Sequence, residues 1–167
     1  YIEQNCNATM SLDLVEKLKD YKTGSYTAVL AHTGELVISM ANMEIYEQLS
    51  PSILKKYEAI MQNASCLIID LNCPLATVEY VREFAHERKI PFAIIPVSSP
   101  KMKNMPEDLQ GVHYFICNRD EAEKYLNMNL EKFGHYEKAV KAMLQKGAKY
   151  VVLTLGEHGV MAGHDGT

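Results

Sequence analysis

The sequence lacks the features that mark several large classes of protein. No run of apolar residues approaches the roughly 18 that a membrane-spanning helix requires. The sequence has no internal repeat, no low-complexity segment and no broad stripe of Lys and Arg, and its 17 basic and 21 acidic residues give a formal net charge of −4. A disordered chain and a protein that binds nucleic acid through bulk charge are therefore excluded. We expect neither a nucleic-acid partner nor a membrane association.

Cysteine is scarce, and its spacing is not that of a metal-binding or disulfide-bonded protein. The four cysteines are Cys6, Cys66, Cys73 and Cys117. No two of them form a CxxC pair, and no histidine completes a zinc site. Cys66 and Cys117 lie inside apolar runs, where cysteine usually acts as a small hydrophobic residue. The pattern indicates reduced thiols and a cytoplasmic protein.

The length and composition are those of a folded domain. The chain has 167 residues, 47% of them hydrophobic, which is enough for one domain with a substantial core. It begins without Met, in Tyr-Ile-Glu-Gln, and ends in the turn-like Gly-His-Asp-Gly-Thr. We expect both ends to be cut from a longer sequence.

Residues 24–40 predict a β-hairpin. Two runs rich in strand-forming residues flank a turn at His32-Thr33-Gly34-Glu35. In the first arm Tyr26, Ala28 and Leu30 fall on one face of the strand. This alternation predicts a sheet with one packed face and one face available to a ligand.

From residue 50 onward, short apolar runs alternate with amphipathic helical patterns. The runs predict strands at 67–71, 91–97, 114–117 and 150–155, and the patterns predict helices at 50–61, 75–88, from Asp120 and at 135–146, with Ser50 and Gly147 as N-cap and C-cap. This order predicts an α/β fold with a doubly wound, mostly parallel sheet flanked by helices on both faces. The hairpin is then a small separate β-element. In such sheets ligands bind beyond the carboxyl ends of the strands.

Asn118 and Glu121 follow one of these strands, at the start of a predicted helix. Their Asn-x-x-Glu spacing places an amide and a carboxylate in the first turn, and both supply oxygen atoms suited to hydrated Mg²⁺ beside phosphates. The same spacing is that of a capping box, in which Asn118 is the N-cap and Glu121 reaches back to the backbone. The two interpretations are compatible, and the pattern alone favours the cap.

Thr154, Gly156 and Gly159 follow the last predicted strand. The two glycines allow a ligand to approach the backbone closely and expose amide groups to an anion, and the Thr154 hydroxyl adds a donor. The alternative is a simple tight turn. Lys101 follows another strand, after Pro96-Val-Ser98, in what is equally well an ordinary loop. Asp70, at the end of a buried strand, is better explained by a structural role.

The order of these segments resembles that of the ribokinase-like (PfkB) family of carbohydrate and nucleoside kinases, over about residues 12–167. The segments that carry the resemblance are Thr23–Leu30 with Gly34-Glu35, Ala41-Asn42-Met43, Asn118-Arg-Asp-Glu121 and Thr154-Leu-Gly-Glu-His-Gly159. Within the family, Met43-Glu-Ile-Tyr46 and Pro96-Val-Ser98 are most similar to bacterial pseudouridine kinases.

The resemblance implies ATP-dependent phosphoryl transfer to a sugar or nucleoside hydroxyl, with pseudouridine as the leading substrate. It implies that residues 23–42 form a β lid that also supports a homodimer, that 1–22 is a remnant leading into it, and that 43–167 is the α/β core. The implied site residues are Tyr26 and Asn42 for the substrate, Thr154, Gly156, Gly159 and Lys101 for the nucleotide, and Asn118 and Glu121 for Mg²⁺. A monovalent cation is a further candidate cofactor.

Three departures from the family pattern bear on activity. The family's early Gly-Gly segment and its late Gly-Ala-Gly-Asp segment, which carries the catalytic base, are both missing between Tyr1 and Thr167. Ile95 stands where many relatives have Asp. We therefore expect the base to lie beyond Thr167 and this fragment alone to be inactive. The alternatives are another PfkB sugar kinase, ribokinase-like or an inosine/guanosine kinase, and a non-catalytic nucleotide- or sugar-binding module.

Overall fold

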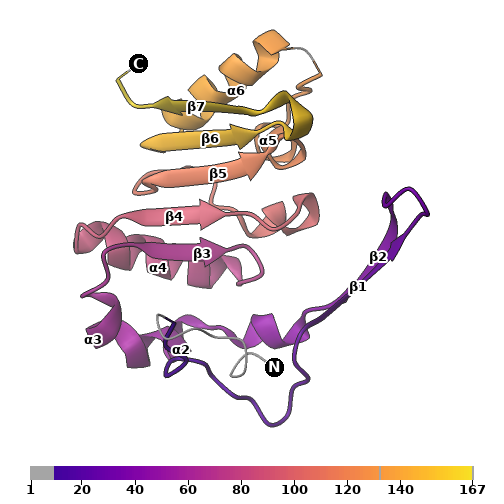
Figure 1. Cartoon of the computed structure of the whole chain (residues 1–167). Helices are drawn as coiled ribbons and strands as arrows, with labels where there is room; N and C mark the ends of the chain where they lie inside the picture. Colours follow the sequence, from indigo (N-terminus) through magenta and orange to yellow (C-terminus); the bar gives the residue numbers. More distant parts are fainter. Residues whose placement is uncertain (1–9, 132, 167) are drawn as a thin grey trace. The chain divides into compact units, whose positions relative to one another are not determined.

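The computed structural model describes residues 10–131 and 133–166, in two compact units (Figure 1). The first unit ends at Ile45 and the second begins at Tyr46. Part of the predicted remnant 1–22, with Cys6, lies outside the described residues. None of the helices that the structure describes has the length and apolarity to span a bilayer.

The first unit contains the predicted hairpin. Strands β1 (Ser25–Leu30) and β2 (Leu36–Asn42) pair antiparallel. The turn is closed by a hydrogen bond from the Ala31 amide to the Glu35 carbonyl, 2.8 Å, and it contains Gly34 with a φ of +86°. A positive φ favours glycine, because a Cβ atom would clash with the backbone. The hairpin and its turn are thus confirmed.

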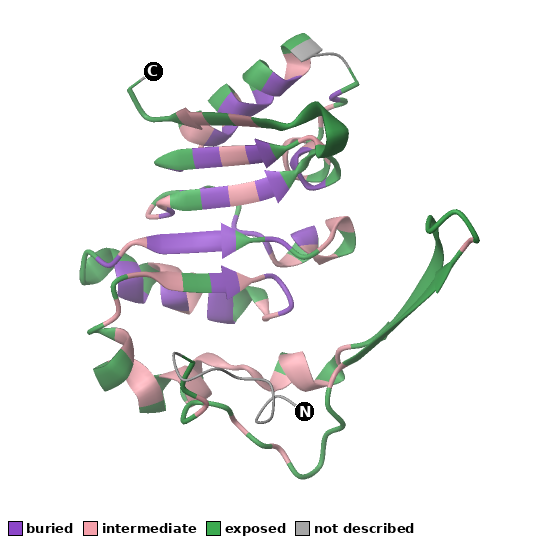
Figure 2. Ribbon diagram, viewed as in Figure 1, coloured by how far each residue is buried: buried purple, intermediate pink, exposed green. Residues whose placement is uncertain are grey.

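The packing predicted for this hairpin is wrong. We expected one face of the sheet to be packed, but every residue of β1 and β2 is exposed, as Figure 2 shows. A two-stranded ribbon gives each side chain neighbours only within the sheet, and burial requires a second layer. The alternation of residues in β1 therefore does not correspond to an inside and an outside.

The second unit is built on a five-stranded sheet with the order β3-β4-β5-β6-β7. The parallel strands are β3 (Leu67–Asp70), β4 (Phe92–Ile95), β5 (Tyr114–Asn118) and β6 (Tyr150–Thr154). Strand β7 (Val160–His164) runs antiparallel to β6. The α/β class and the mostly parallel sheet are confirmed. The sequence pattern did not predict β7, because only three consecutive apolar residues mark it.

Three helices pack on one face of this sheet. They are α4 (Leu75–Glu87), α5 (Arg119–Leu126) and α6 (Phe133–Gln145), close to the predicted bounds. The buried sheet residues on the helical side include Phe115, Cys117, Val151 and Leu153, and the apolar side of α4 is buried as predicted. Gly147, the predicted C-cap of α6, has a φ of +114°.

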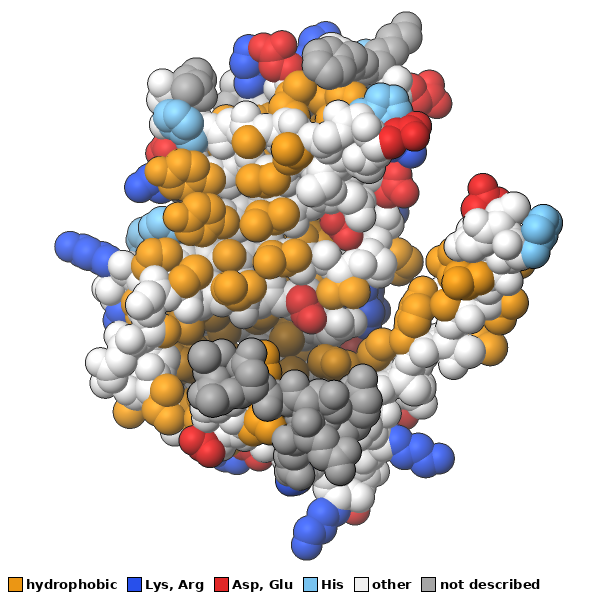
Figure 3. Space-filling model, in the orientation of Figure 1, with side chains coloured by type: hydrophobic (Ala, Val, Ile, Leu, Met, Phe, Trp, Pro, Cys, Tyr) orange, Lys and Arg blue, Asp and Glu red, His pale blue; other side chains and the backbone are white. Residues whose placement is uncertain are grey.

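The opposite face of the sheet is open in the part of the chain that the structure describes. Ile68 is 67% exposed, and Tyr114 and Tyr150 are about two fifths exposed. The two tyrosine rings stack, with their centroids 5.2 Å apart. Figure 3 views this face, where hydrophobic side chains lie in rows over the strands. The prediction that helices cover both faces therefore holds for one face among the described residues.

The segment before β3 was predicted as one helix over 50–61, and it is interrupted. It consists of α2 (Pro51–Leu54), the 3-10 turn η2 (Lys55–Tyr57) and α3 (Glu58–Met61). Tyr57 leaves the helical region, with φ −111° and ψ 5°. The Tyr80 hydroxyl of α4 donates to the Glu58 carboxylate. Helix propensity is a weak determinant of structure, and tertiary contacts such as this one compete with it.

Ser50 and Pro51 begin the segment as predicted, with Pro51 at the first helical position. The Ser50 side chain makes no capping hydrogen bond, and its hydroxyl instead pairs with that of Ser52 at 2.7 Å. The remaining 3-10 turns are η1 (Glu44–Gln48), η3 (Ser99–Asn104) and η4 (Gly156–His158).

Candidate functional site

The carboxyl ends of β5 and β6 bring two predicted site residues together. Asn118, the last residue of β5, is the direct neighbour of Thr154, the last residue of β6. The Thr154 hydroxyl donates to the carbonyl of Cys117 at 3.4 Å, and both Asn118 and Thr154 are exposed. Because the strands are parallel and in register, the helix that follows β5 and the loop that follows β6 start at the same edge of the sheet.

Asn118 and Glu121 form a complete capping box. The Asn118 side-chain oxygen accepts from the Glu121 amide, and the Glu121 carboxylate accepts from the Asn118 amide, each at 2.9 Å. Two N–H groups at the start of α5 are thereby satisfied. The structural interpretation of the Asn-x-x-Glu motif is therefore confirmed.

The capping box leaves the Glu121 carboxylate in a buried position. The residue is 2% exposed, and burial raises the pKa of its carboxyl above the usual range. The bond from the Asn118 amide lowers the pKa, and the charge of Asp120 raises it further. An acidic group at the first turn of a helix also interacts favourably with the helix dipole. Glu121 is thus a fixed acid whose charge is costly unless a cation or a donor faces it.

The oxygen atoms at this edge are better suited to binding the waters of a hydrated divalent ion than to coordinating the ion directly. Among residues 10–131 and 133–166, no three His, Cys, Asp or Glu side chains converge to hold a metal ion. Asn118 and Glu121 each already accept one hydrogen bond through a side-chain oxygen. A carboxylate has further lone pairs, and Mg²⁺ commonly keeps several of its waters. These two residues could hold the waters of such an ion.

The glycine loop after β6 is a tight turn that also leaves two amides exposed. Gly156 and Gly159 have φ values of +60° and +84°, and the Leu155 amide bonds the Gly159 carbonyl at 2.8 Å. The predicted turn is therefore present. Within the described residues the amides of Gly156 and Glu157 donate no hydrogen bond, and both residues are exposed. A Cβ atom at either glycine would meet nothing within 4 Å, so the loop borders open space.

Lys101 lies in η3, which follows β4 and packs beside α5. Its side chain is half-buried, and its amide bonds the Ser98 carbonyl at 2.9 Å. In the part of the chain that the structure describes, no hydrogen bond or ion pair joins it to Asn118 or Thr154, so its role stays a prediction.

Two residues near this edge were missed by the sequence reasoning. Asn72 is only 7% exposed, and its side chain donates to the Asp70 carboxylate at 3.3 Å. Asn104 donates to the Leu71 carbonyl at 3.0 Å and so ties η3 to the end of β3. The signal that could have found Asn72 is the Asp-x-Asn spacing directly after a buried strand, whereas no sequence signal marks Asn104. The structural role given to Asp70 agrees with its bond to the Asn72 amide, 2.8 Å.

Tyr26 and Asn42 lie in the first unit, near the open ends of the hairpin. Ser25 pairs with Asn42, and Tyr26 pairs with Ala41. Tyr26 is 59% exposed, and the Asn42 side-chain oxygen accepts from the Glu44 amide at 3.3 Å. Their predicted contact with a substrate stays a prediction.

Cys73 and Cys117 are poor nucleophiles. Burial, with the charge of Asp70, raises the pKa of Cys73 to about 11, and burial, with the charge of Glu121, raises that of Cys117 to about 12. Both groups stay protonated at neutral pH, and only a thiolate reacts readily. The chemistry of this edge is therefore that of amides, hydroxyls and carboxylates.

The comparison with known proteins identifies a family for this chain. Residues 3–167 match the pfkB family carbohydrate kinase. The chain is 24% identical over 165 residues to guanosine-inosine kinase of Exiguobacterium acetylicum, covering 94% of this chain and 54% of that protein. It is 26% identical over 138 residues to pseudouridine kinase of Escherichia coli strain K12, covering 83% and 44%. The chain belongs to the pfkB family of carbohydrate kinases.

A solved structure gives the same result for the fold. The carbohydrate kinase of Agrobacterium tumefaciens superposes with a TM-score of 0.73 at 25% identity, covering 89% of this chain and 47% of that one. The ribokinase-like fold is therefore confirmed. The chain spans about half the length of the curated relatives it matches.

Proposed function

We propose that the whole protein transfers a phosphoryl group from ATP to a hydroxyl of a sugar or nucleoside. The observation that carries this proposal is the pairing of Asn118 with Thr154, which sets the Asn-x-x-Glu motif beside the glycine loop. Phosphoryl transfer depends chiefly on positioning and on neutralising charge, so a motif for a hydrated cation beside unpaired backbone donors suits it.

Each predicted residue has one role in this proposal. Asn118 and Glu121 hold the waters of Mg²⁺, which offsets the charge of the phosphates when it is bound. The exposed amides of the turn that begins at Gly156 donate to phosphate oxygens, and so does the Thr154 hydroxyl once it turns away from the Cys117 carbonyl. The conformation of that turn depends on Gly159. Lys101 adds a positive charge on the same side of the molecule as the end of β4.

The hairpin supplies the remaining roles. Tyr26 and Asn42 contact the substrate, and the hairpin closes over it to exclude water. The ribbon also exposes a set of large apolar side chains that suit an interface with a second copy: Val29, Leu30, Leu36, Val37, Ile38 and Met40. We propose a homodimer through this ribbon. No residue of this chain is assigned as the base that accepts the hydroxyl proton.

Pseudouridine is the substrate that we propose first, because a pseudouridine kinase is among the relatives and the segments after Met43 and Pro96 resemble that group. The low identities favour no single substrate: a guanosine-inosine kinase, a deoxyribokinase and a ribokinase also match. The nucleoside kinases and the sugar kinases share a ribose-like hydroxyl as phosphoryl acceptor, which sets the range to be tested.

The test is a kinase assay of the full-length protein with Mg-ATP and four acceptors: pseudouridine, uridine, ribose and inosine. We expect the largest kcat/KM with pseudouridine. Turnover of another acceptor without turnover of pseudouridine would reject that substrate but keep the kinase. Binding of ATP with no turnover of any acceptor would instead favour a non-catalytic binding module.

A further inference from the structure

A hollow of about 710 Å³ lies on the helical side of the second unit. Its walls come from η3 and the residues that follow it, from the last turn of α5, and from Lys146 just after α6. Neither Asn118 nor Glu121, nor Lys101, nor any residue of the glycine loop lines it. Its size is that of pockets that take small molecules, about 300–1,000 Å³.

The charge of this hollow is positive. Three of its lining residues are lysines, Lys103, Lys124 and Lys146, and Glu107 is its one acid. Lys103 and Lys124 are exposed, and among the residues that the structure describes neither side chain forms a hydrogen bond or an ion pair. Three ammonium groups against one carboxylate leave an excess of positive charge at the hollow, which attracts an anion with more than one negative charge.

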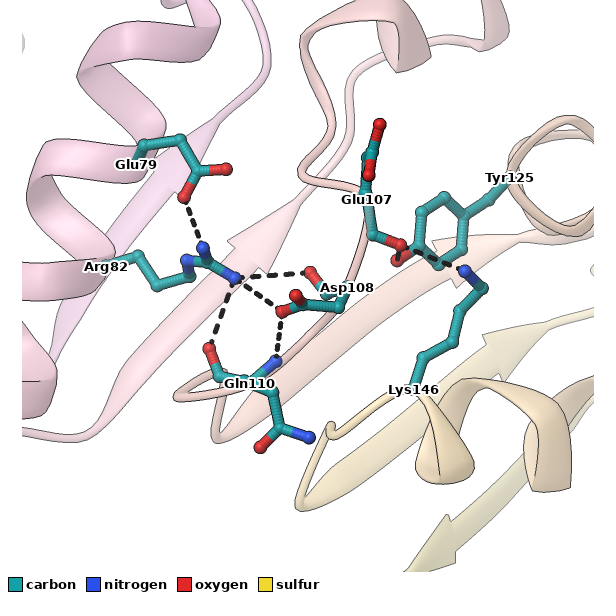
Figure 4. A network of polar contacts seen from close by, with 7 residues as sticks. All are labelled: Glu79, Arg82, Glu107, Asp108, Gln110, Tyr125 and Lys146. Atoms are coloured by element: carbon teal, nitrogen blue, oxygen red, sulfur yellow. Dashed lines mark hydrogen bonds and ion pairs between the residues drawn. The ribbon is translucent and has the colours of Figure 1, made fainter.

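One wall of the hollow is held rigid by a shared acceptor. The Glu107 carbonyl accepts from the Tyr125 hydroxyl at 3.1 Å and from the Lys146 ammonium at 2.9 Å. The ammonium also lies 5.0 Å from the centroid of the Tyr125 ring, an attractive cation–π geometry. Figure 4 shows these three residues together. An ammonium has three N–H donors, so Lys146 is fixed in place while it keeps donors for a ligand.

The rest of the lining is apolar. Met105 and Pro106 are buried and Pro100 is exposed, and with the Tyr125 ring they give the hollow a hydrophobic surface beside its lysines. A bare inorganic ion would leave this surface wet, whereas an organic anion would cover it.

We propose that this hollow binds a small organic anion that carries at least two negative charges, the chemistry shared by phosphate esters and polycarboxylates. The fixed Tyr125–Lys146 wall orients the ligand, and Lys103 and Lys124 supply the charge that recognises it. The proposal does not depend on the proposed kinase activity, because it concerns residues outside the motif and the glycine loop.

The test is calorimetric titration of the full-length protein with phenyl phosphate, an organic phosphate ester, and, separately, with citrate. It compares the wild type with the double variant Lys103→Glu/Lys124→Glu. The matched control is Lys55→Glu/Lys138→Glu, which changes the net charge equally at two exposed lysines outside the hollow. A probe that binds at the nucleotide loop would bind all three proteins equally. Such binding is thereby distinguished from binding in the hollow.

We expect the wild type and the control to bind at least one probe, and the hollow variant to lose at least about tenfold in affinity for it. A preference for phenyl phosphate identifies a phosphate ester as the ligand class, and a preference for citrate identifies a polycarboxylate. The proposal is overturned if the wild type binds neither probe. It is also overturned if the hollow variant Lys103→Glu/Lys124→Glu binds the probe as tightly as the control variant does.

Discussion

Asn118 and Thr154 are register partners at the ends of two adjacent parallel strands. Five consecutive pairs, from Tyr114 with Tyr150 to this one, fix that register. A slip of one residue would turn each side chain to the other face of the sheet. Phe115 and Val151 are buried on the helical side, so such a slip would expose them. The packing of the core on the helical side thus determines where the motif and the glycine loop meet.

Replacing Glu121 by Gln separates its role as a helix cap from its proposed role as a ligand for the waters of Mg²⁺. The Gln side-chain oxygen still accepts from the Asn118 amide, so we expect the fold to be kept. The carboxylate charge is lost, so in the full-length enzyme the Mg²⁺ concentration for half-maximal rate should rise by about 10- to 100-fold. The measurement is the kinase rate as a function of Mg²⁺ concentration, with the melting temperature recorded for each protein.

The control for this variant is Glu137→Gln, which removes an exposed carboxylate on α6. It should leave the Mg²⁺ dependence unchanged. If Glu121→Gln gives the same Mg²⁺ curve as the wild type, Glu121 acts only as a helix cap.

The burial of Glu121 also predicts a pH dependence of stability. Burial raises the pKa of this carboxyl in the folded state above its value in the unfolded chain. Its stabilising contribution is therefore complete below the unfolded pKa and is lost as the pH rises through the folded pKa. The free energy of unfolding of the wild type minus that of Glu121→Gln should fall as the pH is raised from about 3 to 8. Urea unfolding across this range measures the difference, and a rise would show that the capping bonds outweigh burial.

The sequence predicted the second unit more completely than the first. The buried strands were found because they are short continuous apolar runs, and α4 was found because its apolar residues recur at helical spacing. The motif was found because capping and metal-binding chemistry need the same spacing. The burial of the hairpin could not be predicted, because alternation in β1 does not reveal whether a second layer exists. Strand β7 was missed because it lies at the edge, where only Met161 and Gly163 of its residues are even half-buried.

Gly159→Ala should destabilise the protein through its backbone. Gly159 has a φ of +84° and a ψ of −135°, a region that L-residues with a Cβ atom avoid, although nothing lies within 4 Å of that Cβ. We expect a loss of about 1–3 kcal/mol in the free energy of unfolding and a higher KM for ATP. Gly134→Ala in α6 is the matched control, because its Cβ also meets nothing within 4 Å and its φ is not positive. It should be neutral or stabilising. Equal losses in the two variants would rule out a backbone cause.

Arg82 joins α4 to the segment before β5, and its removal should cost more than the loss of a surface ion pair. Its guanidinium lies 2.6 Å from the Glu79 carboxylate and 2.7 Å from that of Asp108, and it donates to the Gln110 carbonyl at 3.4 Å, as Figure 4 shows. The Arg82 side chain is only 17% exposed. We expect Arg82→Met to lower the free energy of unfolding by about 1–2 kcal/mol, because Glu79 and Asp108 are left without their cation.

The matched control is Lys141→Met, which removes an exposed ion pair with Glu137 of similar length, 2.8 Å. Its cost should be about 0.3–0.5 kcal/mol. The pH dependence adds a second criterion. The bond from the Gln110 amide and then Arg82 lower the pKa of Asp108, so this stabilisation exists above the unfolded pKa and is lost as the pH falls through the folded one. The difference between wild type and Arg82→Met should therefore shrink in acid. A difference that stays constant with pH would mean that Arg82 acts through packing of its aliphatic stem and not through Asp108.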